Sequence, residues 1–174
     1  MIKALTTAFE NDISLFIIET NNSLIEIFDC YDCIPSLQRS YIKTEEKQPT
    51  HFTLNNPLSM GLVFAAIDNG ILKSSDPSRC DFAIGNFLKL CFVEIKKVKT
   101  NQRNKAKSDA IEQLGAAISM FKEKINLNNT ELIAIICINF KKVYPARTAA
   151  SANNVVKFKD DYNAALMEGQ SHIF

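Results

Sequence analysis

The sequence predicts an α/β domain in which helices flank a central mixed β-sheet. Residues 131–140 (ELIAIICINF) are almost wholly apolar and rich in β-branched side chains, which is typical of a strand buried on both faces. The segment before them has apolar side chains three and four residues apart, which predicts a helix over about 105–124 with one buried face. These side chains are Ile111, Leu114, Ile118, Phe121 and Ile125.

The first 55 residues predict a short helix over 2–10, a β-hairpin and a long loop. The hairpin strands are the apolar runs 13–19 and 24–29, because the residues between them, Thr20-Asn21-Asn22-Ser23, are typical of turns. Residues 30–55 are polar and contain Pro35 and Pro49, so we expect an irregular loop or lid.

Residues 56–70 predict a helix. Asn56 would cap it and Pro57 would occupy its first turn, while Asn69-Gly70 would end it in a left-handed conformation. A short strand over 71–73 follows, and then two strands over 80–84 and 89–97. After the helix at about 105–124 and the buried strand, we expect a final helix near 160–167.

The length and composition predict one domain over residues 1–174. Its core would span about 56–140, between an N-terminal extension (1–55) and a C-terminal tail with a helix (141–174). The chain has 47% hydrophobic and 22% charged residues and a net charge of +1, which is typical of a soluble globular protein. Without an apolar span or a signal-peptide pattern, we expect a cytoplasmic protein with no membrane partner.

The five cysteines fall into two groups. Cys80, Cys91 and Cys137 lie in or beside apolar runs and should be buried, reduced side chains. Cys30 and Cys33 have the spacing of half a zinc site, but no second pair follows. We favour a chance pair of loop cysteines, with a zinc or redox module as the alternative.

Basic residues are concentrated in one stretch of twelve residues that contains no acid. The general interpretation is a solvated loop and helix start, and the specific one is a phosphate-binding patch. The residues are Lys96, Lys97, Lys99, Arg103, Lys105 and Lys107.

Acidic residues at the ends of two neighbouring strands predict a metal site. In the strand 89–97, Glu94 and Lys96 share a face with Leu90 and Phe92, and such charges are costly to bury without a purpose. Asp81 begins the preceding antiparallel strand, so its carboxylate can meet that of Glu94. Two converging carboxylates are the hard oxygen ligands that Mg²⁺ prefers.

This metal site depends on where the hairpin turns. A tight turn at Gly85-Asn86 would place Asp81 about 13 Å short of Glu94 along the strand. Bringing the two acids opposite each other needs a turn centred on residues 87 and 88. We therefore expect a longer loop or a β-bulge within 85–90.

The segment resembles the PD-(D/E)xK nuclease superfamily, the restriction-endonuclease-like enzymes. Asp81 matches the family's aspartate and Glu94-Ile95-Lys96 its ExK element, although Cys80 stands where the family often has proline. The resemblance implies catalytic roles for these two acids and Lys96, with the Ile95 carbonyl as a further metal ligand. A glutamine on the following helix is also common in the family, and Gln113 is suitably placed; because it lies at the flank of the apolar stripe, it either supports the site or is a surface residue.

A further acidic ligand often comes from upstream in this family, and Asp68 is the candidate. The alternatives are Glu10, Glu19 and Glu26.

The resemblance implies a Mg²⁺- or Mn²⁺-dependent endonuclease or exonuclease that hydrolyses phosphodiester bonds of DNA, in defence or in genome maintenance. Nucleic acid would be its partner, bound by Lys97, Lys99, Arg103, Lys105 and Lys107. The N-terminal extension, a homodimer or a partner protein would supply specificity. The alternative is a non-catalytic binding or interaction protein, of immunity or adaptor type, on the same fold.

Overall fold

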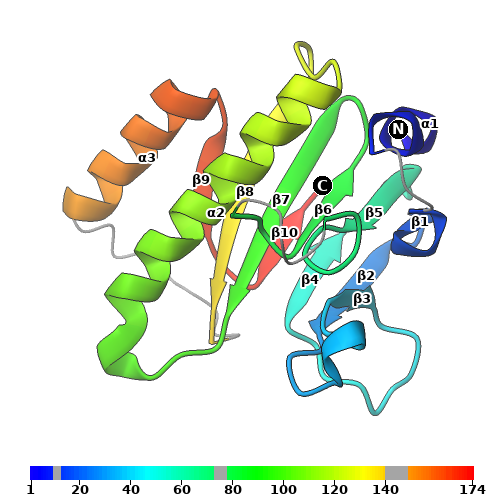
Figure 1. Cartoon of the computed structure of the whole chain (residues 1–174), viewed down its shortest axis with the longest axis horizontal. Helices are drawn as coiled ribbons and strands as arrows, with labels where there is room; N and C mark the ends of the chain where they lie inside the picture. The colour runs from blue at the N-terminus through cyan, green and yellow to red at the C-terminus, as the bar shows by residue number, and fades with distance from the viewer. Residues whose placement is uncertain (10–12, 73–77, 140–148) are drawn as a thin grey trace.

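The computed structural model describes residues 1–9, 13–72, 78–139 and 149–174, and its α/β architecture confirms the predicted class (Figure 1). A six-stranded main sheet has the order β1-β5-β6-β7-β8-β9. Its strands are β1 (Ile17–Thr20), β5 (Leu62–Ala66), β6 (Phe82–Gly85), β7 (Lys89–Lys96), β8 (Glu131–Ile138) and β9 (Ala165–Glu168). A four-stranded small sheet has the order β10-β4-β2-β3. Its strands are β2 (Leu24–Asp29), β3 (Ser40–Ile42), β4 (Phe52–Asn55) and β10 (Ser171–Ile173).

The main sheet is mixed. Strands β1, β5, β6 and β7 are antiparallel neighbours, whereas β7, β8 and β9 run parallel. Parallel neighbours need a crossover connection. Helix α2 (Arg103–Lys124) lies between β7 and β8 in the chain, and α3 (Ala149–Tyr162) lies between β8 and β9. Because β1 and β9 form the two edges, the N-terminal extension and the C-terminal tail are both built into the same sheet as the core.

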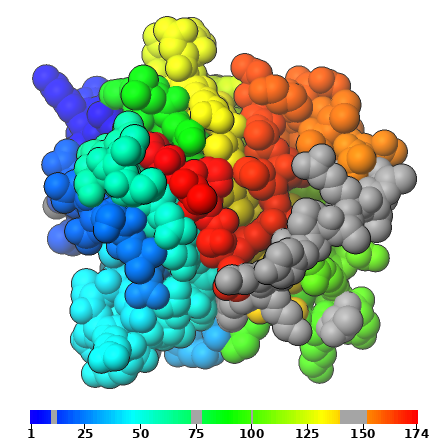
Figure 2. Space-filling model, turned by 180° about the vertical axis from the view of Figure 1, so that it is seen from behind, coloured from blue at the N-terminus to red at the C-terminus, as the bar shows by residue number. Residues whose placement is uncertain are grey.

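The main sheet is buried on both faces, so the described chain has three layers. On one face, α2 and the N-terminal helix α1 (Ile2–Ala8) cover it, and Phe121 contacts Phe92 and Phe9 with ring centroids 5.0 and 5.2 Å apart. On the other face lies the small sheet, where Phe82 contacts Phe52 and Phe64 at 5.8 and 5.4 Å. Figure 2 shows the reverse side, where the C-terminal residues, with β10 paired to β4 at the edge of the small sheet, lie between β4 and α3.

Several predicted elements are confirmed. The structure has a helix within 2–10, a strand over 24–29, strands within 80–84 and 89–97, a helix over all of 105–124 and a strand within 131–140. None of the described helices combines the length and the apolar character needed to cross a membrane.

The predicted helix over 56–70 is wrong. Asn56 does bind main-chain groups, but its Oδ1 accepts the N–H of Met60 (3.0 Å) and its Nδ2 donates to the Met60 carbonyl (2.9 Å) within a turn. The next five residues, Leu62–Ala66, are all buried and form β5, since a short apolar run without helical periodicity fits a strand covered on both faces. Asn69 has the predicted left-handed backbone (φ 50°), but it follows this strand. Leu72 makes an isolated bridge to Asp68, and Lys73 lies outside the described residues.

The predicted N-terminal hairpin and loop are also wrong. β1 pairs with β5 in the main sheet, while β2 pairs with β3 and β4 in the small sheet, so residues 20–23 connect two layers. The 3₁₀ turn Ser14–Phe16 precedes β1. The expected loop over 30–55 contains β3, β4 and the 3₁₀ turn Pro35–Leu37. Short strands with polar outer faces escape detection because only every second residue is buried, as in β4.

The predicted final helix near 160–167 is wrong in its bounds, because this range covers the end of α3 and most of β9. α3 ends at Tyr162, and β9 begins at Ala165. In β9, Leu166 is buried between the exposed Ala165 and Met167, which is the two-residue alternation of a strand. Pairing with β8 therefore decides the conformation there.

Candidate functional site

The β6–β7 hairpin brings the two predicted acids together. Phe82 pairs with Val93 and Gly85 with Leu90, and continuing this register by one pair puts Asp81 opposite Glu94. No bulge interrupts the pairing between residues 82–85 and 90–93. The expected bulge is therefore absent, and the turn itself lies two residues further along than Gly85-Asn86.

Asn86 and Gly85 close this turn. The Asn86 N–H donates to the Lys89 carbonyl (2.8 Å), which leaves Phe87 and Leu88 at its centre, as the metal-site prediction requires. The Asn86 Oδ1 accepts the N–H groups of Leu88 (2.9 Å) and Lys89 (3.2 Å). Gly85 has φ +156°, and a Cβ there would lie 2.2 Å from the Lys89 carbonyl oxygen. The residue types at the turn thus set the register that aligns the acids.

Glu94 is a buried carboxylate with incomplete hydrogen bonding. It is 2% exposed, and its Oε1 contacts the Lys96 Nζ at 2.5 Å. Its Oε2 has no hydrogen-bond partner within the described part of the chain. Burial raises the pKa of Glu94 to about 7, although the Lys96 ammonium acts in the opposite direction. A buried oxygen without a partner is costly, and it fits a site that receives a ligand.

Asp81 is held by β7, the strand that carries Glu94. Its Oδ2 accepts the main-chain N–H of Ile95 at 2.5 Å, across the hairpin. Burial, and then the charges of Glu94 and Asp29, raise the pKa of Asp81 well above its usual range. A buried carboxyl whose pKa is raised by a neighbouring carboxylate is an arrangement that a divalent cation relieves.

Lys96 supplies the positive charge of the site. Its side chain is 25% exposed and contacts Glu94. Burial opposes its ammonium, but the neighbouring Glu94 carboxylate outweighs burial, and the pKa of Lys96 is raised. Lys96 therefore stays protonated at neutral pH.

Two further acids lie close enough to act on these groups. Asp68 follows β5, and its charge raises the pKa of Glu94 and of Asp29. Its Oδ1 is held by the Arg79 Nε at 2.6 Å. Asp29 ends β2 in the small sheet, and burial, followed by the Asp68 charge, raises its pKa to about 6.

Asp29 is the site residue that sequence reasoning missed. Its signal was an acid at the end of an apolar strand, the same signal that Glu94 carries. The predicted hairpin had placed that strand away from the core.

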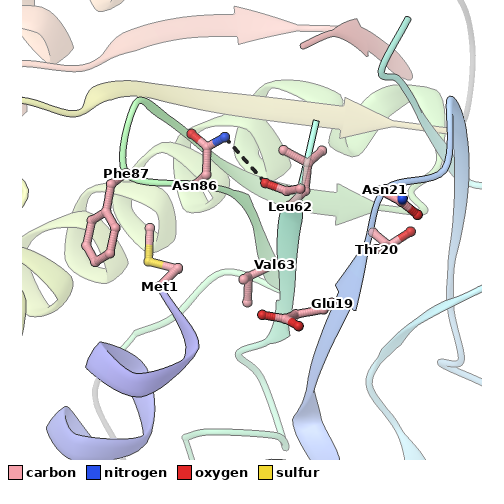
Figure 3. A pocket seen from close by; sticks show the side chains of 9 residues that line it. Met1, Glu19, Thr20, Asn21, Leu62, Val63, Asn86 and Phe87 are labelled. Carbon is pink, nitrogen blue, oxygen red and sulfur yellow. Dashed lines mark hydrogen bonds between the residues drawn. The ribbon is translucent and has the colours of Figure 1, made fainter. Parts of the chain in front are cut away.

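The other proposed acids lie elsewhere. Glu26 binds Thr50 (2.7 Å) and Lys43 (3.4 Å) in the small sheet. Glu19 lines a cavity of about 470 Å³ with Asn86 and Phe87, at the turn end of the β6–β7 hairpin and away from Asp81 (Figure 3). Glu10 is outside the described residues. Of the three upstream candidates that the structure describes, Asp68 is the one that it brings to the site.

Gln113 lies behind the site. Its Nε2 donates to the carbonyl of Arg79 (3.1 Å), two residues before Asp81, and its buried Oε1 has no partner among the described residues. The helix α2 therefore holds the segment that leads into β6, and the supporting role of Gln113 in the site stays a prediction.

The basic residues divide into paired and exposed groups. Arg103 and Lys107 both bind the carboxylate of Glu168 in β9, Lys107 at 2.8 Å. Lys97 donates to the Tyr31 hydroxyl at 2.5 Å. Lys99 and Lys105 are exposed. The pairing with Glu168 reduces the free charge of the expected phosphate patch at Arg103 and Lys107.

The cysteines are also in two states. Cys80, Cys91 and Cys137 are buried thiols, as predicted. Cys30 and Cys33 are joined in a disulfide, so the interpretation as a chance pair is wrong. Because both sulfurs are in the disulfide bond, neither is a zinc ligand in this oxidised state.

The donor set fits a hard cation. Among residues 1–9, 13–72, 78–139 and 149–174, no three acidic, histidine or cysteine side chains converge closely enough to enclose a metal ion. A site with two carboxylates must therefore complete its shell with a main-chain carbonyl and water, which is how Mg²⁺ is usually bound. The unpartnered Glu94 Oε2 and the raised pKa values are the observations that fit such an ion.

Comparisons of the chain with protein-family models, with curated proteins and with solved structures return no significant match. The site is therefore interpreted from its own geometry.

Proposed function

We propose that the chain is a metal-dependent phosphodiesterase of the PD-(D/E)xK type that hydrolyses DNA. The observation that carries the proposal is the hairpin register, which sets Asp81 opposite the buried Glu94 with Lys96 in contact. The order β5-β6-β7-α2-β8 supports it in part, because three strands, a helix and a strand are similar to that family's restriction-endonuclease-like core, although the helix expected before them over 56–70 is absent. Defence and genome maintenance are the roles that this resemblance suggests.

Each site residue has a distinct task in this proposal. Asp81, Glu94 and the Ile95 carbonyl would hold Mg²⁺ or Mn²⁺ with water completing the shell, and the nearby charges of Asp29 and Asp68 would favour the bound cation. The bound ion supplies a water of lowered pKa and stabilises negative charge on the phosphate. Lys96 stays protonated, orients the attacking water and neutralises charge on the phosphate oxygens. Gln113 keeps the strand of Asp81 in place through the Arg79 carbonyl.

The test compares wild type with Glu94→Gln and with Glu131→Gln. Glu131 undergoes the same chemical change, but its side chain is 61% exposed at the start of β8, away from the site. Plasmid and single-stranded DNA are incubated with Mg²⁺ or Mn²⁺, or with a chelator, after circular dichroism has shown that the three proteins are folded. We expect metal-dependent cleavage by wild type and Glu131→Gln, and a loss on the order of 100-fold in Glu94→Gln.

Two results would contradict the proposal. Equal cleavage by wild type and Glu94→Gln would identify a contaminating nuclease. No cleavage by wild type with either metal, on either form of DNA, would remove the hydrolase and leave the binding module.

A non-catalytic nucleic-acid-binding module is the second candidate. It is favoured by the Glu94–Lys96 ion pair, which occupies the lysine without a metal. Here the salt dependence of DNA affinity is informative. Lys105→Ala should lower the slope by about 1, because Lys105 is exposed and has no ion-pair partner among the described residues. Lys107→Ala should lower it less, because Glu168 already binds that ammonium.

A further inference from the structure

A small disulfide-closed ring lies next to the candidate site. Cys30 and Cys33 are joined with their Cα atoms 5.4 Å apart, and the ring directly follows Asp29. The Cys30 N–H donates to the Arg39 carbonyl (3.1 Å), and the Cys33 N–H donates to the Cys30 carbonyl (3.3 Å). The ring is therefore attached to the end of β2, where the missed acid lies.

Tyr31, inside the ring, also contacts the residue that directly follows β7. The hydroxyl of Tyr31 accepts a hydrogen bond from the Lys97 Nζ (2.5 Å), and that ammonium lies 4.3 Å from the centre of the Tyr31 ring. Lys97 directly follows Lys96. Tyr31 also stacks on His51, with ring centroids 5.7 Å apart, and the His51 Nδ1 accepts the main-chain N–H of Asp29 (3.0 Å). Tyr31 thus connects the segments that carry Asp29 and Lys96.

These two cysteines differ from the other three in chemical accessibility. Cys80 and Cys91 are fully buried, and burial raises the pKa of both thiols. Such thiols react slowly. Cys30 and Cys33 are only partly buried, and the exposed residues Asp32 and Ile34 flank Cys33. A dithiol in solution therefore has access to this disulfide and not to the buried thiols.

We propose that Cys30–Cys33 is a thiol–disulfide exchange site whose reduction by a dithiol weakens the metal site next to it. A thiolate of the reductant attacks one sulfur, the Cys30–Cys33 bond breaks, and the other sulfur leaves as a thiolate that takes up a proton. The second thiol of the reductant then displaces the remaining cysteine from the mixed disulfide. Two electrons and two protons pass to the protein, and the reductant ends as a disulfide.

Reduction of the disulfide should weaken the contacts of Tyr31 and Asp29. With the ring closed, Tyr31 stays beside Lys97 and Asp29 stays against His51. Opening the ring frees the Tyr31 backbone, so both contacts loosen. The assignment of a metal to this site rests on the proposed function. Because contacts behind metal ligands commonly change metal affinity 10- to 100-fold, we expect about tenfold weaker Mn²⁺ binding on reduction.

The experiment uses the full chain in two redox states. One sample is kept oxidised, and the other is reduced with dithiothreitol and desalted without oxygen. Alkylation of the folded protein and mass spectrometry should find two modified cysteines, Cys30 and Cys33, in the reduced sample alone. Mn²⁺ affinity, DNA cleavage and amide hydrogen exchange over residues 26–39 and 94–99 are then compared. We expect weaker Mn²⁺ binding, slower cleavage and faster exchange in both segments after reduction.

Two variants assign the effect. The double variant Cys30→Ser/Cys33→Ser should match reduced wild type and should not respond to dithiothreitol. Tyr31→Phe keeps the disulfide but removes the acceptor for Lys97, so its 94–99 segment should exchange faster even when oxidised. A response to dithiothreitol that persists in the double variant would overturn the proposal.

The results separate this inference from the proposed function. Unchanged exchange over 94–99 between the two redox states would overturn the exchange site, whatever the cleavage assay shows. Metal-dependent cleavage that is equal in both states, with equal Mn²⁺ affinity, would overturn it and leave the nuclease proposal standing. Absence of cleavage in both states, with redox-dependent exchange, would remove the nuclease and leave the exchange site.

Discussion

Glu94 combines three properties that are rarely found together in one side chain. It is buried, one of its oxygens has no partner in the described chain, and the acids Asp29 and Asp68 raise its pKa. Lys96 offsets part of this cost through one contact at 2.5 Å. In the absence of a cation, the folded protein therefore favours a protonated carboxyl group at this position.

The metal-free protein should lose stability as the pH rises. The pKa of Glu94 is about 7 in the folded state and 4.5 ordinarily, so between these values the folded state binds a proton that the unfolded state releases. Stability then falls with rising pH across this window, by roughly 1–3 kcal/mol. The raised pKa values of Asp29 and Asp81 act in the same direction. Urea unfolding at pH 5 and pH 8, with a chelator present, measures the effect.

Glu94→Gln is the matched control for this pH dependence. Glutamine does not titrate, so the difference in unfolding free energy between pH 5 and pH 8 should shrink, although Asp29 and Asp81 keep part of it. Added Mg²⁺ should stabilise wild type more at pH 8 than at pH 5, because it competes with protons for the carboxylates. A pH dependence that is the same in both proteins would contradict the burial argument.

Single residues were the most predictable level of the site. Asp81, Glu94 and Lys96 could be selected because charges at the ends of apolar strands are unusual, and that needs no knowledge of the fold. Asp29 carried the same signal, but selecting it required knowing that β2 belongs to a second sheet that packs on the first. The pairing of Arg103 and Lys107 with Glu168 was likewise invisible, because more than sixty residues separate these partners.

At the scale of elements, the β6–β7 hairpin is decisive. A shift of one residue would turn Glu94 to the opposite face, and a turn at Gly85-Asn86 would separate it from Asp81. The side chain of Asn86 and the backbone of Gly85 prevent both alternatives.

Gly85→Ala should disrupt the turn. Its φ of +156° is unfavourable for alanine, and the added Cβ would lie 2.2 Å from the Lys89 carbonyl oxygen. We expect a loss of about 2–4 kcal/mol in unfolding free energy, together with loss of cleavage, because Asp81 and Glu94 no longer align. Gly61→Ala is the control, since nothing lies within 4 Å of a Cβ there. Equal stability of the two variants, measured in urea, would show that the turn tolerates alanine.

Elements were predictable where the pattern was long. The helix α2 and the strands β7 and β8 have at least eight residues each, which is enough for periodicity or continuous burial to be recognised. Residues 56–70 failed because Asn56-Pro57 has the chemistry of a helix start, and only the burial of all five residues of β5 excludes a helix.

At the scale of the whole molecule, the site depends on two sheets. The main sheet supplies Asp81, Glu94 and Lys96, while the small sheet supplies Asp29. Phe52 on β4 contacts Phe82, which directly follows Asp81, so the contact between the layers lies beside the site.

Phe52→Ala should weaken both the fold and the site. Phe52 is fully buried between the sheets, and its truncation should lower the unfolding free energy by about 3–5 kcal/mol. Phe87→Ala is the control, because Phe87 is 45% exposed at the turn and should change stability little. Denaturant titrations compare the stabilities, and Mn²⁺ titration should find weaker binding in Phe52→Ala alone, because Asp29 loses its fixed position. Equal Mn²⁺ affinity in both variants would show that the small sheet is dispensable for the metal site.

The sequence by itself determined the α/β class, the long helix, the buried strands and the three chemical groups at the hairpin, because each rests on periodicity or on the cost of burying a charge. Only the tertiary structure decided the separation of β1 and β2 into two sheets, the position of Asp29 near Asp81 and Glu94, and the closure of the Cys30–Cys33 ring. The physical reason is that local hydrophobic patterns in the sequence indicate which residues are buried. Which buried surfaces then meet depends on contacts between segments that are distant in the chain.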